Sequence, residues 1–258
     1  MAELTSEVTD LGDLGQPLIQ RTSVAAATWA LFVGLALVMV GNGLNGSVVG
    51  VRSDAAGFDA AIISVIMAAY FAGFLAGTVY AERALKSVGH IRVFAALASV
   101  ASSVVLLQAI SVTAPTWIMT RFFFGACMAG IYVVVESWLN DLATNTTRGR
   151  ILSVYMIVTM GGVGAGQLLL NVNDSSGFTL FIIISVLVSM SLVPVTLSAS
   201  SAPPLVTPES MGLRILIQRV PTGVVSSFFC GAGAGALLGM GAVYGSRVEM
   251  QPGRLSLF

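Results

Sequence analysis

The stretch FAGFLAGTVYAERALKSVGHIRVFAALAS (71–99) decides the fold, because it places a short charged segment between two long apolar ones. The flanking gaps, 60–81 and 93–120, contain no Asp, Glu, Lys or Arg. A charged side chain at the centre of a bilayer costs about 3 kcal/mol on insertion scales. Backbone groups in lipid must also satisfy their hydrogen bonds internally, which favours helices. The stretch therefore predicts two membrane-spanning helices joined by a basic loop.

The composition of the whole chain agrees with this interpretation. Of its 258 residues, 56% are hydrophobic and only 9% are charged, and twelve basic residues balance twelve acidic ones. A soluble globular domain has about 25% charged residues. The absence of a basic excess also argues against binding to nucleic acid. An all-α membrane protein is the class that remains, since runs such as FIIISVLVSM (181–190) lack the alternation of a membrane β-barrel.

Further charge-free gaps divide the rest of the chain in the same way. The predicted spans are 24–49, 58–81, 92–112, 115–139, 151–172, 178–198 and 222–245. The predicted organisation is an N-terminal tail (1–23), a six-helix unit (24–198), a linker (199–221), a seventh helix (222–246) and a short tail (247–258). Six helices, a polar linker and one more helix suggest a repeated architecture, of the kind from which many transporters are built.

The basic residues set the orientation, because cytoplasmic loops carry an excess of Lys and Arg. With the N-terminus in the cytoplasm, eight basic residues lie on that side and three on the other. The eight are Arg21, Arg83, Lys86, Arg92, Arg148, Arg150, Arg214 and Arg219. We therefore expect a cytoplasmic N-terminus. Arg121 is the one basic residue in the interior of a predicted span.

Three stretches carry a resemblance to a known family. These are 71–99, ESWLNDLATNTTRGRILSVYMIVTMGGVGAGQLLL (136–170) and TGVVSSFFCGAGAGALLGMGAVYG (222–245). They resemble the major facilitator superfamily of transporters, in its YcaD-like bacterial branch, and the resemblance covers nearly all of 24–246. It implies the N-terminal six-helix bundle of a twelve-helix fold plus one helix of the second bundle, so we expect a chain truncated after its seventh helix.

The superfamily's loop motif, Gly-x-x-x-Asp-Arg-x-Gly-Arg-Arg, is only partly present. Gly89, His90 and Arg92 match its end, but Lys86 stands where the acidic residue would be. The resemblance thus leaves the family's gating pair in doubt here. In the fourth predicted helix, Arg121 and Gly125 match the superfamily's Arg-x-x-x-Gly pattern.

Arg121 is the main candidate for contact with a solute, since an ionisable group inside the membrane is a functional hypothesis by default. Its alternative interpretation is an arginine that reaches the outer interface with its stem in lipid. Polar residues expected at the same depth are Asn42 and Asn45, and Gln167 and Asn171. Tyr70, midway along the second predicted span, either lines the same cavity or packs as an aromatic side chain. Each amide pair shares a helix face. If those faces meet Arg121, they form a polar layer for an anionic or hydrogen-bonding solute; otherwise the amides only join helices.

A second group of polar residues lies at the predicted cytoplasmic end. Glu136, Asp141, Arg148 and Arg150 suggest an ion-pair cluster that braces a loop, or alternatively a gate that opens toward the cytoplasm.

Glycines spaced four apart predict close helix packing. These are Gly73 and Gly77, Gly162 and Gly166, and Gly231, Gly235 and Gly239.

The resemblance implies a secondary transporter that works by alternating access, not an enzyme, in the bacterial inner membrane. The expected partners are the lipid bilayer, a small solute and a missing second half. The alternative is a non-transporting remnant, or a half-transporter that needs a partner chain. No cofactor or metal is expected: GNGLNG (41–46) matches a dinucleotide-binding pattern but falls inside a span, and His90 is the only histidine.

The predicted topology can be tested with a reporter enzyme that is active only in the cytoplasm. Fused within 199–221, the reporter is expected to be active, because this linker is basic and follows an even number of spans. A fusion at 50–57, on the opposite side, serves as the inactive control. A silent reporter at 199–221 contradicts the orientation.

Overall fold

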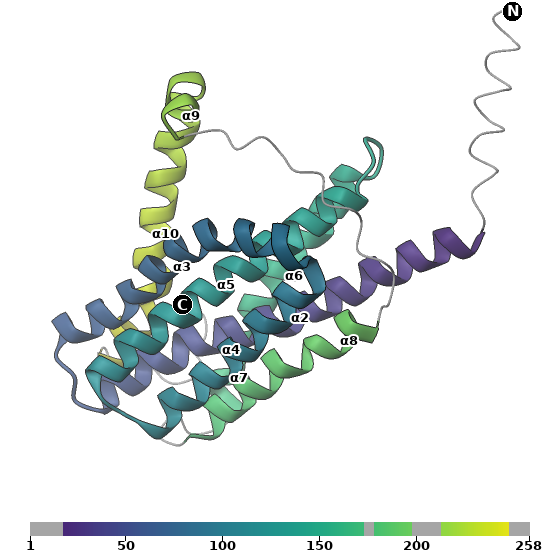
Figure 1. Cartoon of the computed structure of the whole chain (residues 1–258). Coiled ribbons are helices and arrows are strands. Elements are labelled where there is room, and N and C mark those ends of the chain that lie inside the picture. The colour runs from purple at the N-terminus through teal and green to yellow at the C-terminus, as the bar shows by residue number, and fades with distance from the viewer. Residues whose placement is uncertain (1–17, 173–177, 198–212, 248–258) are drawn as a thin grey trace, which may run out of the picture.

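A computed structural model of the chain describes residues 18–172, 178–197 and 213–247, and these residues form helices and no strand (Figure 1). The helices are α2 (Leu18–Ala55), α3 (Ala60–Val88), α4 (His90–Ile110), α5 (Ala114–Leu142), α6 (Arg148–Leu168), the 3₁₀ turn η1 (Leu169–Val172), α7 (Thr179–Met190), α8 (Leu192–Leu197), α9 (Leu213–Arg219) and α10 (Pro221–Arg247).

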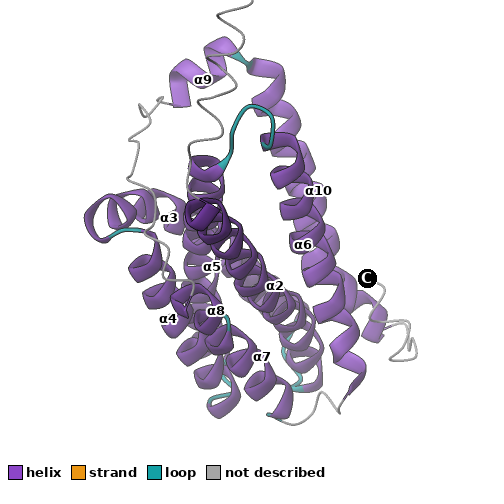
Figure 2. Ribbon diagram, turned by 90° about the vertical axis from the view of Figure 1, so that its right-hand side faces the viewer, coloured by secondary structure: helices purple, strands orange, loops and turns teal. Residues whose placement is uncertain are grey.

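Six helical segments of the described residues have the length and apolar composition to cross a membrane. They correspond to the first six predicted spans, and the predicted all-α membrane fold is confirmed. The predicted seventh span corresponds to α10, which lies along one side of the bundle with α9 at its end (Figure 2). Most of the expected tails and of the linker falls outside the described residues, and α2 begins at Leu18, within the stretch expected as the N-terminal tail.

The helices extend beyond the charge-free gaps that predicted them. Arg52 lies in the last turn of α2 and Lys86 in that of α3. A charge-free gap marks the part of a helix that lies in hydrocarbon, and the backbone helix continues into the polar layer where charges are tolerated. Gly89 then reverses the chain between α3 and α4 with a φ of +83°, a conformation that favours glycine.

The sixth predicted span consists of two helices, α7 and α8, with Ser191 between them. Pro194 is responsible, because it has no N–H to donate to the carbonyl of Met190 and its ring clashes with that carbonyl. The break at Ser191 therefore lies where Pro194 interrupts the backbone hydrogen bonds of a continuous helix.

Helices α2 and α5 form the centre of the bundle, and 61% of the apolar stretch of each is buried. Large side chains of α5, including Trp117, Phe124 and Trp138, are almost fully enclosed. By contrast, α3 and the α6 segment bury only 28% and 22% of their apolar stretches. These two helices therefore present the largest apolar faces to whatever surrounds the bundle.

Two glycine seams hold the bundle together. In the seam between α3 and α5, a Cβ on Gly73 would lie 1.8 Å from the Phe122 carbonyl oxygen, and one on Gly125 would lie 2.0 Å from that of Tyr70. In the seam between α2 and α6, a Cβ on Gly166 would lie 2.1 Å from the Val40 carbonyl oxygen. Close backbone approach of this kind stabilises helix pairs in membranes.

The predicted packing role is thus confirmed for the glycines of α3 and α6. It is wrong at Gly231 of α10, where a Cβ would meet open space within 4 Å. At Gly235 a Cβ would make an ordinary contact of 3.5 Å with the ring of Phe71. Glycine spacing alone cannot predict which helix, if any, packs against the small face.

Substituting Gly73 by alanine is expected to destabilise the bundle by about 3 kcal/mol, because the new methyl group must push α3 and α5 apart. Gly161→Ala on α6 is the matched control, since a Cβ there meets nothing within 4 Å. Thermal unfolding in detergent checks both variants. Equal midpoints for the two would contradict the seam.

Candidate functional site

Arg121 lies on α5 with only 5% of its surface exposed, so its guanidinium is enclosed by neighbouring helices. Its Nη1 donates a hydrogen bond of 2.7 Å to Oδ1 of Asn45 on α2. Its Nη2 lies 3.8 Å from the sulfur of Met67 on α3. The guanidinium carbon stands 4.8 Å from the centre of the Tyr70 ring, within cation–π range. The alternative of an arginine reaching the outer interface therefore does not describe this side chain.

Further hydrogen bonds extend this contact over four helices. Asn45 donates from Nδ2 to Oε1 of Gln108 on α4 at 3.0 Å. The Tyr70 hydroxyl donates to Oδ1 of Asn42 at 3.2 Å. We call the resulting group the Arg121 layer: Asn42, Asn45, Tyr70, Gln108 and Arg121. It joins α2, α3, α4 and α5 at one depth of the bundle.

The charge of Arg121 has no counter-charge among the described residues. Its partners among these residues are an amide oxygen, a thioether and an aromatic face, all neutral. Its Nε is buried without a hydrogen-bond partner. Burying a charge without an opposite charge is costly, and such costs concentrate at functional sites. The Arg121 layer therefore holds a buried positive charge that its described neighbours do not neutralise.

Two of the candidates predicted from the sequence do not reach this layer. Asn171 is exposed, and its Nδ2 donates to the carbonyl of Leu168, 3.2 Å away. Gln167 is half-buried on α6, and no described hydrogen bond joins it to Arg121. The expected shared face is lost because the chain tightens into η1 at Leu169, so Asn171 no longer follows Gln167 with α-helical spacing.

Two members of the site were missed by the sequence reasoning. Gln108 is fully buried and Met67 nearly so. Gln108 is the only side-chain amide within the apolar part of α4, and this was a signal that could have found it. Met67 gives no such signal, because a methionine in an apolar helix is ordinary.

The predicted cytoplasmic end holds a separate polar group around a hollow of about 790 Å³. The Tyr155 hydroxyl of α6 donates to Glu136 of α5 at 2.6 Å. Nε2 of His90 lies 3.2 Å from the Ser137 hydroxyl and 3.8 Å from Oδ2 of Asp141. These contacts connect α4, α5 and α6 next to the α3–α4 turn at Gly89.

The expected ion-pair cluster is wrong in its pairing. Arg148 donates to the Asn140 side-chain oxygen rather than to a carboxylate. Arg92 and Arg150 are exposed, and no ion pair of theirs with Glu136 or Asp141 occurs in the described part of the chain. Exposed arginines lose little by staying hydrated, which explains why they do not pair with these carboxylates.

Within the described ranges, no three His, Cys, Asp or Glu side chains come together to hold a metal. The six apolar helices that are long enough to span a membrane define the chain as an integral membrane protein of the polytopic helical class. The buried cation inside this bundle is Arg121.

Comparison with known proteins narrows that class. No family model matches the chain. It is 34% identical over 135 residues to a protein of Yersinia enterocolitica named as an MFS-type transporter, which covers 51% of this chain and 35% of the relative. An MFS-type transporter of Yersinia pestis is 30% identical over 132 residues. The MFS-type transporter YcaD of Salmonella arizonae is 32% identical over 109 residues, 42% of this chain and 28% of the relative.

The resemblance to YcaD-like members of the major facilitator superfamily is thus confirmed over about half of the chain. The six apolar helices fit a partial major facilitator fold, of the kind expected for its N-terminal half. The chain spans about a third of the length of the curated relatives it matches. These relatives are named as transporters and not as enzymes.

Stability measurements can separate a structural from a functional role for Arg121. Asn45→Leu is expected to cost about 3 kcal/mol, because it leaves a buried charge without its strongest partner. Arg121→Met removes the charge itself and is expected to leave stability unchanged or to raise it. Thermal unfolding of both variants in detergent is the measurement. A larger loss for Arg121→Met than for Asn45→Leu would show that Arg121 is mainly structural.

Proposed function

We propose that the chain supplies the N-terminal bundle of a major facilitator secondary transporter that moves a small anionic solute across the bacterial inner membrane. The observation that carries this proposal is the buried Arg121, whose charge lacks a counter-charge among the described residues. A protein that buries a cation in this way stabilises an anion more than it stabilises its own fold.

The roles in the Arg121 layer follow from its contacts. Asn45 fixes one end of the guanidinium, and Gln108 fixes Asn45. Asn42 positions the Tyr70 hydroxyl, and the Tyr70 ring covers one face of the guanidinium. Arg121 is therefore pre-oriented before the solute arrives, which lowers the ordering cost of binding.

Transport by alternating access needs a second helical bundle on the open side of the site. The large exposed faces of α3 and α6 support this, because they provide the apolar surface against which a second bundle packs. The basic residues support a cytoplasmic N-terminus. In that orientation the polar group around His90, Glu136 and Tyr155 lies at the cytoplasmic end, where it acts as the inner gate.

The same exposed faces favour a second candidate, a half-transporter that pairs with a partner chain. A remnant without transport activity is the remaining alternative. Blue-native electrophoresis and crosslinking of the purified chain distinguish the two: a half-transporter gives a defined complex through α3 and α6, and a remnant gives none.

Uptake of labelled organic anions, neutral solutes and cations by bacterial cells that express the chain together with the second six-helix bundle of a YcaD-like relative tests the proposal. We expect saturable uptake of an anion, and an at least 100-fold loss in Arg121→Gln, because about two charge-assisted hydrogen bonds disappear. Arg219→Gln, at an exposed position of α9, is the matched control and is expected to retain uptake.

Uptake that Arg121→Gln leaves unchanged at equal expression would contradict the role of Arg121. Uptake equal to that of cells that express the second bundle alone would contradict a transport role for the chain and favour the non-transporting remnant.

A further inference from the structure

We propose that the solute is an amphipathic carboxylate, whose carboxylate binds side-on to Arg121 and whose apolar part occupies a hollow between α3 and α10. This inference rests on the proposed function, because it takes Arg121 as the group that meets the solute. It adds the substrate class, and it assigns a second subsite that the Arg121 layer does not contain.

The hydrogen bonds of Arg121 define the side from which an anion binds. A guanidinium offers two parallel N–H groups along its Nε–Nη2 edge, which match the two oxygens of a carboxylate. Asn45 occupies Nη1, on the other side. Nε has no partner, and Nη2 has only the sulfur of Met67, which is a weak acceptor. Of the two edges of a guanidinium that suit a carboxylate, the Nε–Nη2 edge is therefore the one left without a strong acceptor.

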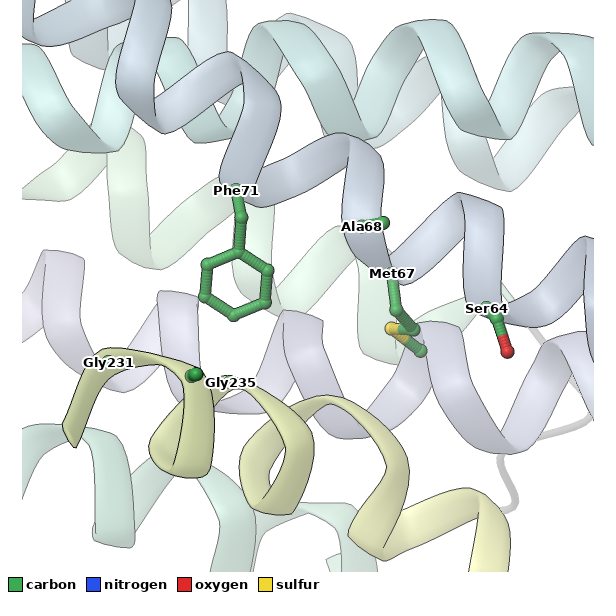
Figure 3. Close-up of a pocket in the computed structure, with 7 residues that line it drawn as sticks. Ser64, Met67, Ala68, Phe71, Gly231 and Gly235 are labelled. Carbon is green, nitrogen blue, oxygen red and sulfur yellow. The ribbon is translucent and has the colours of Figure 1, made fainter. Parts of the chain in front are cut away.

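Met67 connects this edge to the hollow. Its sulfur contacts Nη2 of Arg121, and the same side chain lines a hollow of about 410 Å³ between α3 and α10 (Figure 3). Methionine is unbranched and adaptable, so its thioether can withdraw when a better acceptor arrives. Met67 thus occupies the weak acceptor position that the carboxylate takes over.

The hollow itself suits an apolar group. Figure 3 shows Met67 and Phe71 of α3 facing Gly231 and Gly235 of α10, whose lack of side chains leaves the space open. Its other lining residues are Ser64, Ala68 and Ala232, so the hollow has no charged lining residue. The Ser64 hydroxyl already donates to the Ala60 carbonyl at 2.8 Å. A volume of this size lies within the range of small-molecule sites.

The positive charge of Arg121 determines which amphipathic molecules fit the site. A neutral amphiphile leaves Nε and the charge of Arg121 unsatisfied, and a cationic one is repelled by it. A membrane lipid reaches the hollow with its acyl chains but places its headgroup at the bilayer surface, away from a buried arginine. A carboxylate with a short apolar body satisfies both parts of the site at once.

Equilibrium binding to the purified full-length chain in phosphatidylcholine nanodiscs tests this assignment. The probes are labelled 4-phenylbutyrate, butyrate and 4-phenylbutanol, each corrected for uptake by empty nanodiscs. We expect 4-phenylbutyrate to bind at least 100-fold more tightly than either of the others. Each additional buried methylene is worth about fourfold in Kd.

Variants assign each half of the molecule to its subsite. Gly235→Leu places a side chain in the hollow and is expected to raise the Kd of 4-phenylbutyrate at least tenfold while leaving that of butyrate within twofold. Its backbone tolerates the change, since a Cβ makes only an ordinary contact with Phe71. Gly161→Leu, at an open position of α6, is the matched control and is expected to change neither.

Two further variants test the guanidinium edge. Arg121→Lys keeps the charge but loses the parallel N–H pair, so the Kd of both carboxylates is expected to rise at least tenfold. Met67→Leu keeps the volume but removes the competing sulfur, so the Kd of 4-phenylbutyrate is expected to stay equal or to fall.

The outcomes separate this inference from the proposed function. If Gly235→Leu acts no differently from Gly161→Leu while Arg121→Lys weakens both carboxylates, the hollow is not the apolar subsite and the anion site stands. If Arg121→Lys has no effect, the anion site and the proposed function fall together. Binding of 4-phenylbutanol as tight as that of 4-phenylbutyrate would overturn the carboxylate assignment.

Discussion

The hydrogen bond from Arg121 to Asn45 is the interaction on which the arrangement of the candidate site depends. A guanidinium within a membrane protein must be enclosed by polar partners, and here the strongest of them comes from α2 at 2.7 Å. That requirement fixes α2 beside α5, the two most buried helices. Gln108 then ties α4 to the same point through Asn45. Because every described partner is neutral, these contacts position the charge without cancelling it.

The glycine seams make this arrangement possible. Gly125 lies one helical turn after Arg121, and its missing side chain lets α5 touch the carbonyl of Tyr70. This close approach brings the Tyr70 ring to 4.8 Å from the guanidinium carbon. The packing of α3 on α5 and the electrostatics of Arg121 are therefore one feature of the structure, and a change in the seam also moves the aromatic face.

The distribution of charges in the sequence was enough to predict the helices and Arg121. It was not enough to predict which amide side chains the helix packing brings to Arg121. Charge-free gaps located the helices, and the isolation of Arg121 singled it out, because a charge in lipid is costly enough to leave a clear pattern. Amides are cheaper to bury and leave no such pattern, so Asn171 was expected in the layer although it lies outside, and Gln108 was missed although it belongs there. Their difference comes from the helix interfaces and from the 3₁₀ turn at η1, neither of which hydropathy reports.

On the proposed mechanism, α5 links the two ends of the bundle. Arg121 and Glu136 lie on this one helix, 15 residues and so about 22 Å apart along its axis. Both glycine seams pack backbone against backbone, which resists bending within the bundle. Binding of a solute at Arg121 then changes the Glu136–Tyr155 contact only if the bundle moves as one rigid body. The exposed faces of α3 and α6 are the surfaces along which such a body moves, because they carry the least internal packing.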